Sequence, residues 1–158
     1  MKNEDKTVLV GQILKCDTVL PSGNKYPKNV VEKAVKELNK QLKEGKSFYG
    51  RLIDDVNHSD DLLTGKLTTI SHKVNSVEVK DNGTVFAEIE LLPTTDGIKV
   101  ENVVKSINDI SFRAVARGIG DLNGYKEVLN FEITSVDIVP ENTITENSLK
   151  LKKNKKLF

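Results

Sequence analysis

Residues 109–118 have the sequence DISFRAVARG, and this stretch decides the fold. Apolar side chains alternate with polar ones along it, as expected for a strand with one face in a core. The core-facing set is Ile110, Phe112, Ala114 and Ala116. The opposite face carries Ser111, Arg113, Val115 and Arg117. The stretch therefore predicts a half-buried strand that presents a serine in line with two arginines.

A strand serine becomes a nucleophile only when a base takes its proton, and histidine is the usual base. His58 lies in the acidic segment 54–61, where the predicted strand Phe48–Ile53 gives way to a loop. His72 falls inside an alternating strand, where a histidine on the polar face is expected. Ser111 and His58 are therefore the candidate nucleophile and base. The alternative is a solvated strand serine and a surface histidine.

Three further polar residues bear on this chemistry. Asp137 lies in the apolar strand segment 135–139, where a buried carboxylate needs a partner. That partner is either a histidine that it orients or a structural hydrogen bond. Arg113 and Arg117 are candidates for oxyanion support, with exposed strand charges as the alternative.

Composition bounds the remaining classes. A chain of 158 residues with 37% apolar and 30% charged residues suits one soluble domain. It has neither an apolar run that could span a bilayer nor an apolar signal-peptide segment, so no membrane or secreted form is expected. One cysteine, Cys16, excludes an internal disulfide framework and fits a reducing compartment. With only two histidines, neither a metal site nor another cofactor is predicted.

Two segments have helical periodicity and the others resemble strands. One helix is expected from Pro27 to about Glu44, with Gly45 just past its end, and a second from a cap at Thr94 to near Ile107. The strand-like segments are 7–14, 48–53, 66–80, 84–92, 109–118 and 127–139. The turn Asp81-Asn82-Gly83 predicts a long antiparallel hairpin.

This order predicts an α+β fold, a mainly antiparallel β-barrel with two helices packed outside it. The domain is expected to span residues 1–143. Residues 144–158 lose periodicity and contain five of the 24 basic residues, all between 150 and 156. They are predicted to form a flexible, lysine-rich C-terminal tail.

Four separated segments carry a family resemblance: residues 24–35, Asn57-His58, 110–113 and 136–140. In order and spacing they resemble the prohead core (capsid maturation) serine proteases of tailed phages, which are related in fold to the herpesvirus assemblins. The resemblance spans roughly residues 7–143. Two departures are Ser59, where the family usually has proline, and residues 112–114, where a second serine and a glycine are common.

The resemblance implies that Ser111 is the nucleophile, His58 the general base and Asp137 the third member, in a herpesvirus-protease-like barrel. It implies a serine endopeptidase that cuts scaffold and major capsid proteins inside the prohead, in the bacterial host cytoplasm. No cofactor, membrane or specific nucleic acid is implied, and a homo-oligomer stays open.

The resemblance also implies cleavage after glutamate preceded two positions earlier by leucine or isoleucine. Ile144-Thr145-Glu146 fits this pattern, so self-cleavage after Glu146 would release the tail. Two other functions stay open. One is a catalytically inactive head protein of the same fold, and the other is a non-enzymatic β-barrel module whose basic tail binds an acidic partner.

Overall fold

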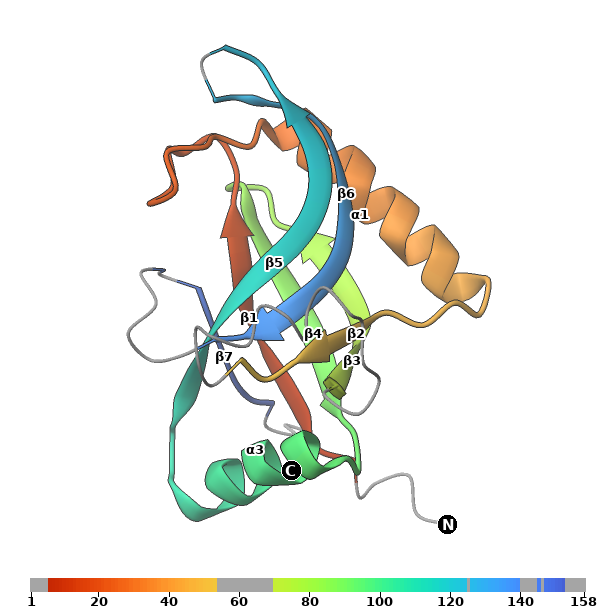
Figure 1. Cartoon of the computed structure of the whole chain (residues 1–158), viewed down its shortest axis with the longest axis vertical. Coiled ribbons are helices and arrows are strands. Elements are labelled where there is room, and N and C mark those ends of the chain that lie inside the picture. Colours follow the sequence, from red (N-terminus) through yellow and green to blue (C-terminus); the bar gives the residue numbers. More distant parts are fainter. Residues whose placement is uncertain (1–5, 54–69, 125, 140–144, 146, 153–158) are drawn as a thin grey trace.

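The computed structural model describes residues 6–53, 70–124, 126–139, 145 and 147–152. Seven strands form one sheet with the order β2-β3-β4-β1-β7-β5-β6, and every strand pair in it is antiparallel (Figure 1). The strands are β1 (Val8–Lys15), β2 (Tyr49–Arg51), β3 (Ile70–Val79), β4 (Thr84–Leu91), β5 (Ser111–Leu122), β6 (Val128–Ile138) and β7 (Ser148–Leu151). The helices are α1 (Lys28–Lys43) and α3 (Thr95–Ser106).

The two end strands of this sheet meet, so that the sheet curls into a nearly closed barrel. Leu52 forms a bridge with Ile138 at the end of β6, and the Ile53 amide donates to the Ile138 carbonyl at 2.7 Å. These contacts join the edge next to β2 to the edge formed by β6. The predicted α+β class and the mainly antiparallel barrel are confirmed.

The barrel encloses one apolar core, because alternate residues of each strand point inward. On β5 the inward residues are Phe112, Ala114 and Ala116, as predicted. Phe112 and Ala116 pack against the core, and Ala114 is fully buried.

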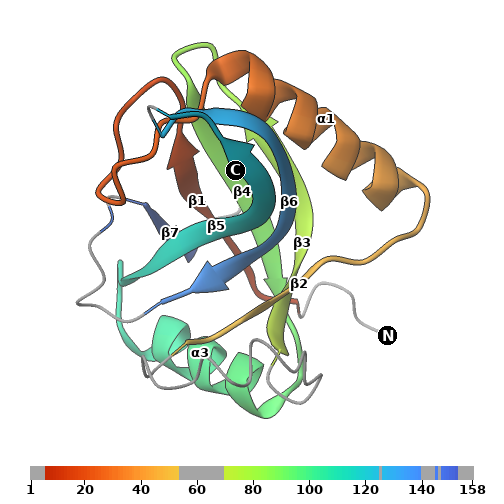
Figure 2. The same cartoon turned by 45° about the horizontal axis from the view of Figure 1, so that its top comes forward.

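Helix α1 lies across the outside of the barrel against β6 and β3 (Figure 2). Its buried stripe is Val31, Ala34, Val35 and Leu38. Gly45, with a φ of 95°, ends the helix, and the Gly45 amide donates to the Leu42 carbonyl. Glycine adopts this left-handed conformation without steric cost, which confirms the predicted end.

Helix α3 lies at one end of the barrel and leads into β5 (Figures 1 and 2). The Thr94 hydroxyl caps it by accepting from the Gly97 amide at 3.0 Å and also donates to the Ile70 carbonyl at 2.7 Å. The predicted cap is confirmed, and it ties α3 to β3. In the described part of the chain, neither helix is long and apolar enough to cross a membrane.

Strand β7 corrects the prediction of a flexible tail over residues 144–158 at positions 148–151, whereas residues 144, 146 and 153–158 lie outside the described residues. Residues 148–151 lie between β1 and β5 in the middle of the sheet, and Leu149 is fully buried. The segment was missed because four residues are too short to show periodicity beside many lysines. Its lysine Lys150 and the following Lys152 stay exposed while Leu149 faces the core.

Leu149 and Leu151 form a matched pair for testing β7. Leu149→Ala should lower the free energy of unfolding by about 2–5 kcal/mol, because it leaves a cavity in the core. Leu151→Ala, at a position that is 36% exposed, should lower it by less than about 1 kcal/mol. Urea denaturation of both variants measures the difference. Equal small effects would mean that residues 148–151 are a loose tail.

Candidate active site

Strand β5 begins at Ser111 directly after a turn that follows α3. The Ile107 amide donates to the Val103 carbonyl at 3.0 Å, and Asp109 then adopts a φ of 59°. Aspartate tolerates this left-handed conformation better than most residues, which suits it to a tight turn. The turn sets where β5 starts and therefore where the serine lies.

The Ser111 side chain is exposed at the first position of β5. In register it faces Lys150 of β7. Within the part of the chain that the structure describes, no hydrogen bond occupies the Ser111 hydroxyl. A hydroxyl that is exposed on a rigid strand is available to a base and to a substrate.

The backbone of β5 around Ser111 is held on both sides. The Ala114 amide donates to the Asn147 carbonyl at 3.1 Å, and the Arg113 carbonyl accepts from the Val139 amide at 2.9 Å. The Arg113 guanidinium donates through Nη1 to the Thr145 carbonyl at 2.7 Å. The residues that precede β7 therefore contact the strand that carries the serine.

Arg117 and Asp137 form an ion pair on the same face of β5 and β6. Arg117 Nε donates to Asp137 Oδ2 at 2.6 Å, and the Asp137 side chain is only 1% exposed. Asp137 Oδ1 accepts from the Arg51 amide at 3.1 Å and from the Ser135 hydroxyl at 3.3 Å. The buried carboxylate is thus satisfied by β5, by β6 and by the backbone of β2.

His58 and Glu146 lie outside the described residues. The strands on either side of these positions are nevertheless fixed. Ile53 is the residue before segment 54–69, and its amide donates to the Ile138 carbonyl at the end of β6. The amide of the following residue, Val139, donates to the Arg113 carbonyl of β5. Ile53 is therefore two strand spacings, about 10 Å, from β5 at Arg113 and Ala114, which follow Ser111 by two and three residues.

His72 is fully buried, so the expectation that it would lie on the polar face of its strand was wrong. Its Nε2 is 2.5 Å from the Val136 carbonyl, and its Nδ1 is 2.6 Å from the Ser71 hydroxyl. A carbonyl only accepts, so Nε2 carries the proton and Nδ1 accepts from Ser71. The pair resembles a nucleophile and its base, but both side chains are 0% exposed, so it joins β3 to β6 as a structural link.

Gly50 is the sequence signal that could have revealed this link. A Cβ added at Gly50 would lie 2.1 Å from His72 Nε2 and 2.0 Å from the Val136 carbonyl oxygen. A glycine inside a strand often marks such a close approach. Among the described residues, no three His, Cys, Asp or Glu side chains converge as they would around a metal ion.

The fold matches a solved structure, that of the bacteriophage T4 capsid assembly protease gp21. The TM-score is 0.65 and the sequence identity 21%, over 84% of this chain and 80% of that chain. The two chains share a fold. The fold of a tailed-phage capsid assembly protease, which the family resemblance implied, is thereby confirmed, and the likeness to the herpesvirus proteases stays a prediction. No protein-family model matches the sequence, and no curated protein matches it.

The burial of His72 generates a pH-dependent prediction. Burial lowers the pKa of His72 from its ordinary value of 6.5, against smaller opposing effects of the Val136 carbonyl and Asp137. The unfolded chain therefore binds more protons as the pH falls below 6.5, and the free energy of unfolding should fall by at most about 1.4 kcal/mol per pH unit. This contribution is complete above that pH and is lost as the pH approaches the folded pKa.

Urea denaturation between about pH 7.5 and pH 5.5 measures this slope. His72→Gln should remove most of it, because glutamine does not titrate. His58→Gln is the control and should keep it. A slope that survives His72→Gln would show that another group is responsible.

Proposed function

We propose that this chain is a serine endopeptidase that cleaves scaffold and capsid proteins inside a phage prohead, in the bacterial host cytoplasm. The observation that carries the proposal is the fold shared with a capsid assembly protease, combined with an exposed serine at the start of β5. A fold alone does not specify a reaction, so the argument rests on the residues of the site.

In the proposed reaction, Ser111 attacks the scissile carbonyl carbon while His58 takes the hydroxyl proton. His58 then gives this proton to the leaving amine, and water releases the acyl group by the reverse proton transfers. Ser111 supports this role because its hydroxyl is exposed and its backbone is fixed by β6 and β7. No metal or other cofactor is part of the proposal.

The chain length between Ile53 and His58 is compatible with the pairing. Five residues can extend about 16–18 Å, which exceeds the roughly 14 Å from Ile53 to Ser111 that two strand spacings across the sheet, about 10 Å, and three residues along β5, about 10 Å, combine to give. A histidine at position 58 is thus within reach of the start of β5. This reach supports the pairing of His58 with Ser111.

The other predicted residues have different kinds of support. Arg113 is two positions from Ser111 on the same strand face, about 7 Å away, and can bear on an oxyanion there. Arg117 binds Asp137 through Nε, and its guanidinium carries further N–H donors that can support an oxyanion. For Asp137, the bonds to Arg117, Arg51 and Ser135 support a positioning role at the junction from which segment 54–69 begins.

A fluorophosphonate probe tests the nucleophile. It should label the wild-type protein at Ser111, and His58→Ala should slow the labelling strongly because the hydroxyl loses its base. Ser111→Ala should abolish labelling and lower cleavage of scaffold or capsid protein by about 10⁴-fold or more. Ser106→Ala, at an exposed serine that ends α3, is the matched control and should be unchanged.

Two other functions predict different results. A catalytically inactive head protein of the same fold would leave scaffold processing unchanged in Ser111→Ala, and the engagement of both Asp137 carboxylate oxygens is compatible with that function. A binding module would lose its partner on removal of residues 150–158 and would not depend on Ser111 or His58.

We also propose self-cleavage after Glu146, which requires the residues around this position to leave their contacts with the barrel. The bond to be cut joins Glu146 to Asn147, and residues on both sides of it are held by β5. The Thr145 carbonyl accepts from the Arg113 guanidinium, and the Asn147 carbonyl accepts from the Ala114 amide. Asn147 is also buried and accepts from Gln12 Nε2 through Oδ1 at 2.8 Å. A protease needs an extended, accessible chain, so this region must open before it is cut.

After cleavage, β7 should stay in the barrel as a separate peptide. Intact-mass measurement under denaturing conditions should show a chain that ends at Glu146, while gel filtration under native conditions should show the peptide 147–158 eluting with it. Glu146→Gln should keep the chain whole, and Glu127→Gln, on the loop before β6, should not. An uncut wild-type chain in mature particles would exclude self-cleavage.

A further inference from the structure

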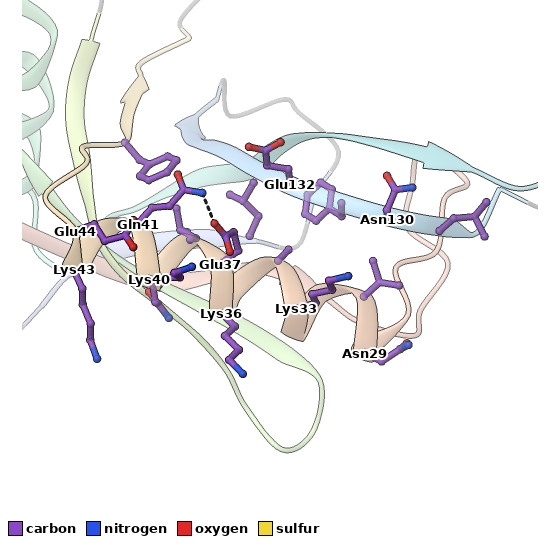
Figure 3. Close-up of a pocket in the computed structure, with 18 residues that line it drawn as sticks. Asn29, Lys33, Lys36, Glu37, Lys40, Gln41, Lys43, Glu44, Asn130 and Glu132 are labelled. Carbon is purple, nitrogen blue, oxygen red and sulfur yellow. Dashed lines mark hydrogen bonds between the residues drawn. The ribbon is translucent and has the colours of Figure 1, made fainter.

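A groove of about 1280 Å³ runs between α1 and residues 129–133 of β6 (Figure 3). Its β6 side is formed by the half of that strand that lies away from Ser111. Seven residues of β5, about 23 Å, separate Ser111 from Gly118, which pairs with Ile133. The groove is therefore distinct from the candidate active site.

The outer edge of β6 is open along this groove. One edge of the strand pairs with β5. Among the described residues, the other edge is bonded only toward its two ends. At one end the Val128 amide donates to the Lys25 carbonyl, and at the other Leu52 bridges to Ile138 and the Val136 carbonyl accepts from His72. Between them, Asn130–Ile133 pair regularly with β5, and register shifts follow on both sides. An edge of this kind presents backbone N–H and C=O groups that another strand can pair with.

The corresponding edge of β3, on the other side of α1, is covered. Asn39 Nδ2 donates to the Val77 carbonyl at 2.8 Å, and Asn39 Oδ1 accepts from the Val77 amide at 3.4 Å. The asparagine amide thus takes the place of a neighbouring strand. No hydrogen bond joins α1 to β6 within the described residues, so the helix satisfies one edge and leaves the other available.

The charges around the groove favour an acidic occupant. Four lysines of α1 are among the lining residues, and in the described part of the chain none of them forms an ion pair: Lys33, Lys36, Lys40 and Lys43. Lys36 and Lys43 extend from the helix away from β6 (Figure 3), so Lys33 and Lys40 are the two that a strand beside β6 would meet. Of the three acidic residues in the lining, Glu37 accepts from Gln41 Nε2 and Glu132 points away from α1 (Figure 3). The third is Glu44, at the end of the helix.

The apolar part of the lining suits a strand with alternating side chains. Leu129 is 56% exposed, and Phe131 is partly buried, with its ring edge-to-face against Tyr26 at 5.0 Å. A strand added to β6 would place alternate side chains on one face, so that one set contacts apolar groups and the other meets charge.

We propose that this groove binds an extended acidic segment of a partner protein, which pairs with the outer edge of β6 between residues 130 and 133 and places its carboxylates near the α1 lysines. The proposal does not depend on hydrolysis at Ser111. A segment bound here would hold its protein on the barrel while another part of that protein reached the start of β5.

Fluorescence anisotropy with a labelled heptapeptide of alternating valine and glutamate tests the charge requirement. This peptide should bind, and its valine–lysine counterpart should bind at least tenfold more weakly. The double variant Lys33→Glu/Lys40→Glu should weaken binding at least about fivefold, since two favourable charge contacts become repulsive. The control Lys46→Glu/Lys99→Glu makes the same charge change at exposed sites outside the groove and should leave binding within twofold.

Two N-methylated versions of the acidic peptide test the strand pairing. Methyl groups on one set of alternate amides block the edge that faces β6, and methyl groups on the other set block the edge that faces away. One version should lose binding and the other should keep it. Equal binding of both versions, equal binding of the two charge types, or an unchanged affinity in the Lys33/Lys40 variant would overturn the proposal.

Discussion

The barrel depends on the link that His72 makes across β2. The imidazole of this β3 residue passes over Gly50 to reach the Val136 carbonyl of β6, so it joins the two strands that flank the shortest strand of the sheet. A buried imidazole with an unsatisfied nitrogen would cost about 1–3 kcal/mol. Both nitrogens are bonded here, and burial keeps the ring neutral by lowering its pKa.

The same junction fixes the surroundings of Ser111. Next to Val136, Asp137 binds the Arg51 amide of β2 and the Arg117 side chain of β5. One residue further, Ile138 accepts from the Ile53 amide. Three consecutive residues of β6 therefore hold β3, β2 and β5 in place, and β5 is held again by β7 on its other side. The serine is exposed on a strand whose position is determined from both edges.

The repeating parts of this fold could be predicted from the sequence. The apolar stripe of α1 and the alternation along β5 repeat over enough residues to reveal a helix and a strand. The turn at Asp81-Asn82-Gly83 is recognisable from its own residues. One feature could not be predicted because it is long-range. Strand β7 is only four residues long, and its place between β1 and β5 depends on partners far away in the chain.

The candidate site was predictable to the same extent. The alternation along β5 places Ser111, Arg113 and Arg117 on one face, but it does not say what each side chain binds. The partners of Arg113 and Arg117 lie at Thr145 and Asp137, which the sequence separates from them by long intervals. His72 was misplaced for the same reason, since a histidine in an alternating strand is buried only where a distant carbonyl accepts from it.

The length of β2 explains why the two ends of the barrel differ. With three residues, β2 fills the space between β3 and β6 only near Val136–Ile138, where Leu52 and Ile53 close the barrel. Beyond that point none of the described strands lies between β3 and β6, and α1 packs across the opening. A helix fills the apolar space but cannot extend a ladder of backbone hydrogen bonds. Asn39 compensates on β3 alone. The closed end therefore supports the serine strand, and at the other end β6 keeps an edge that no described residue pairs with.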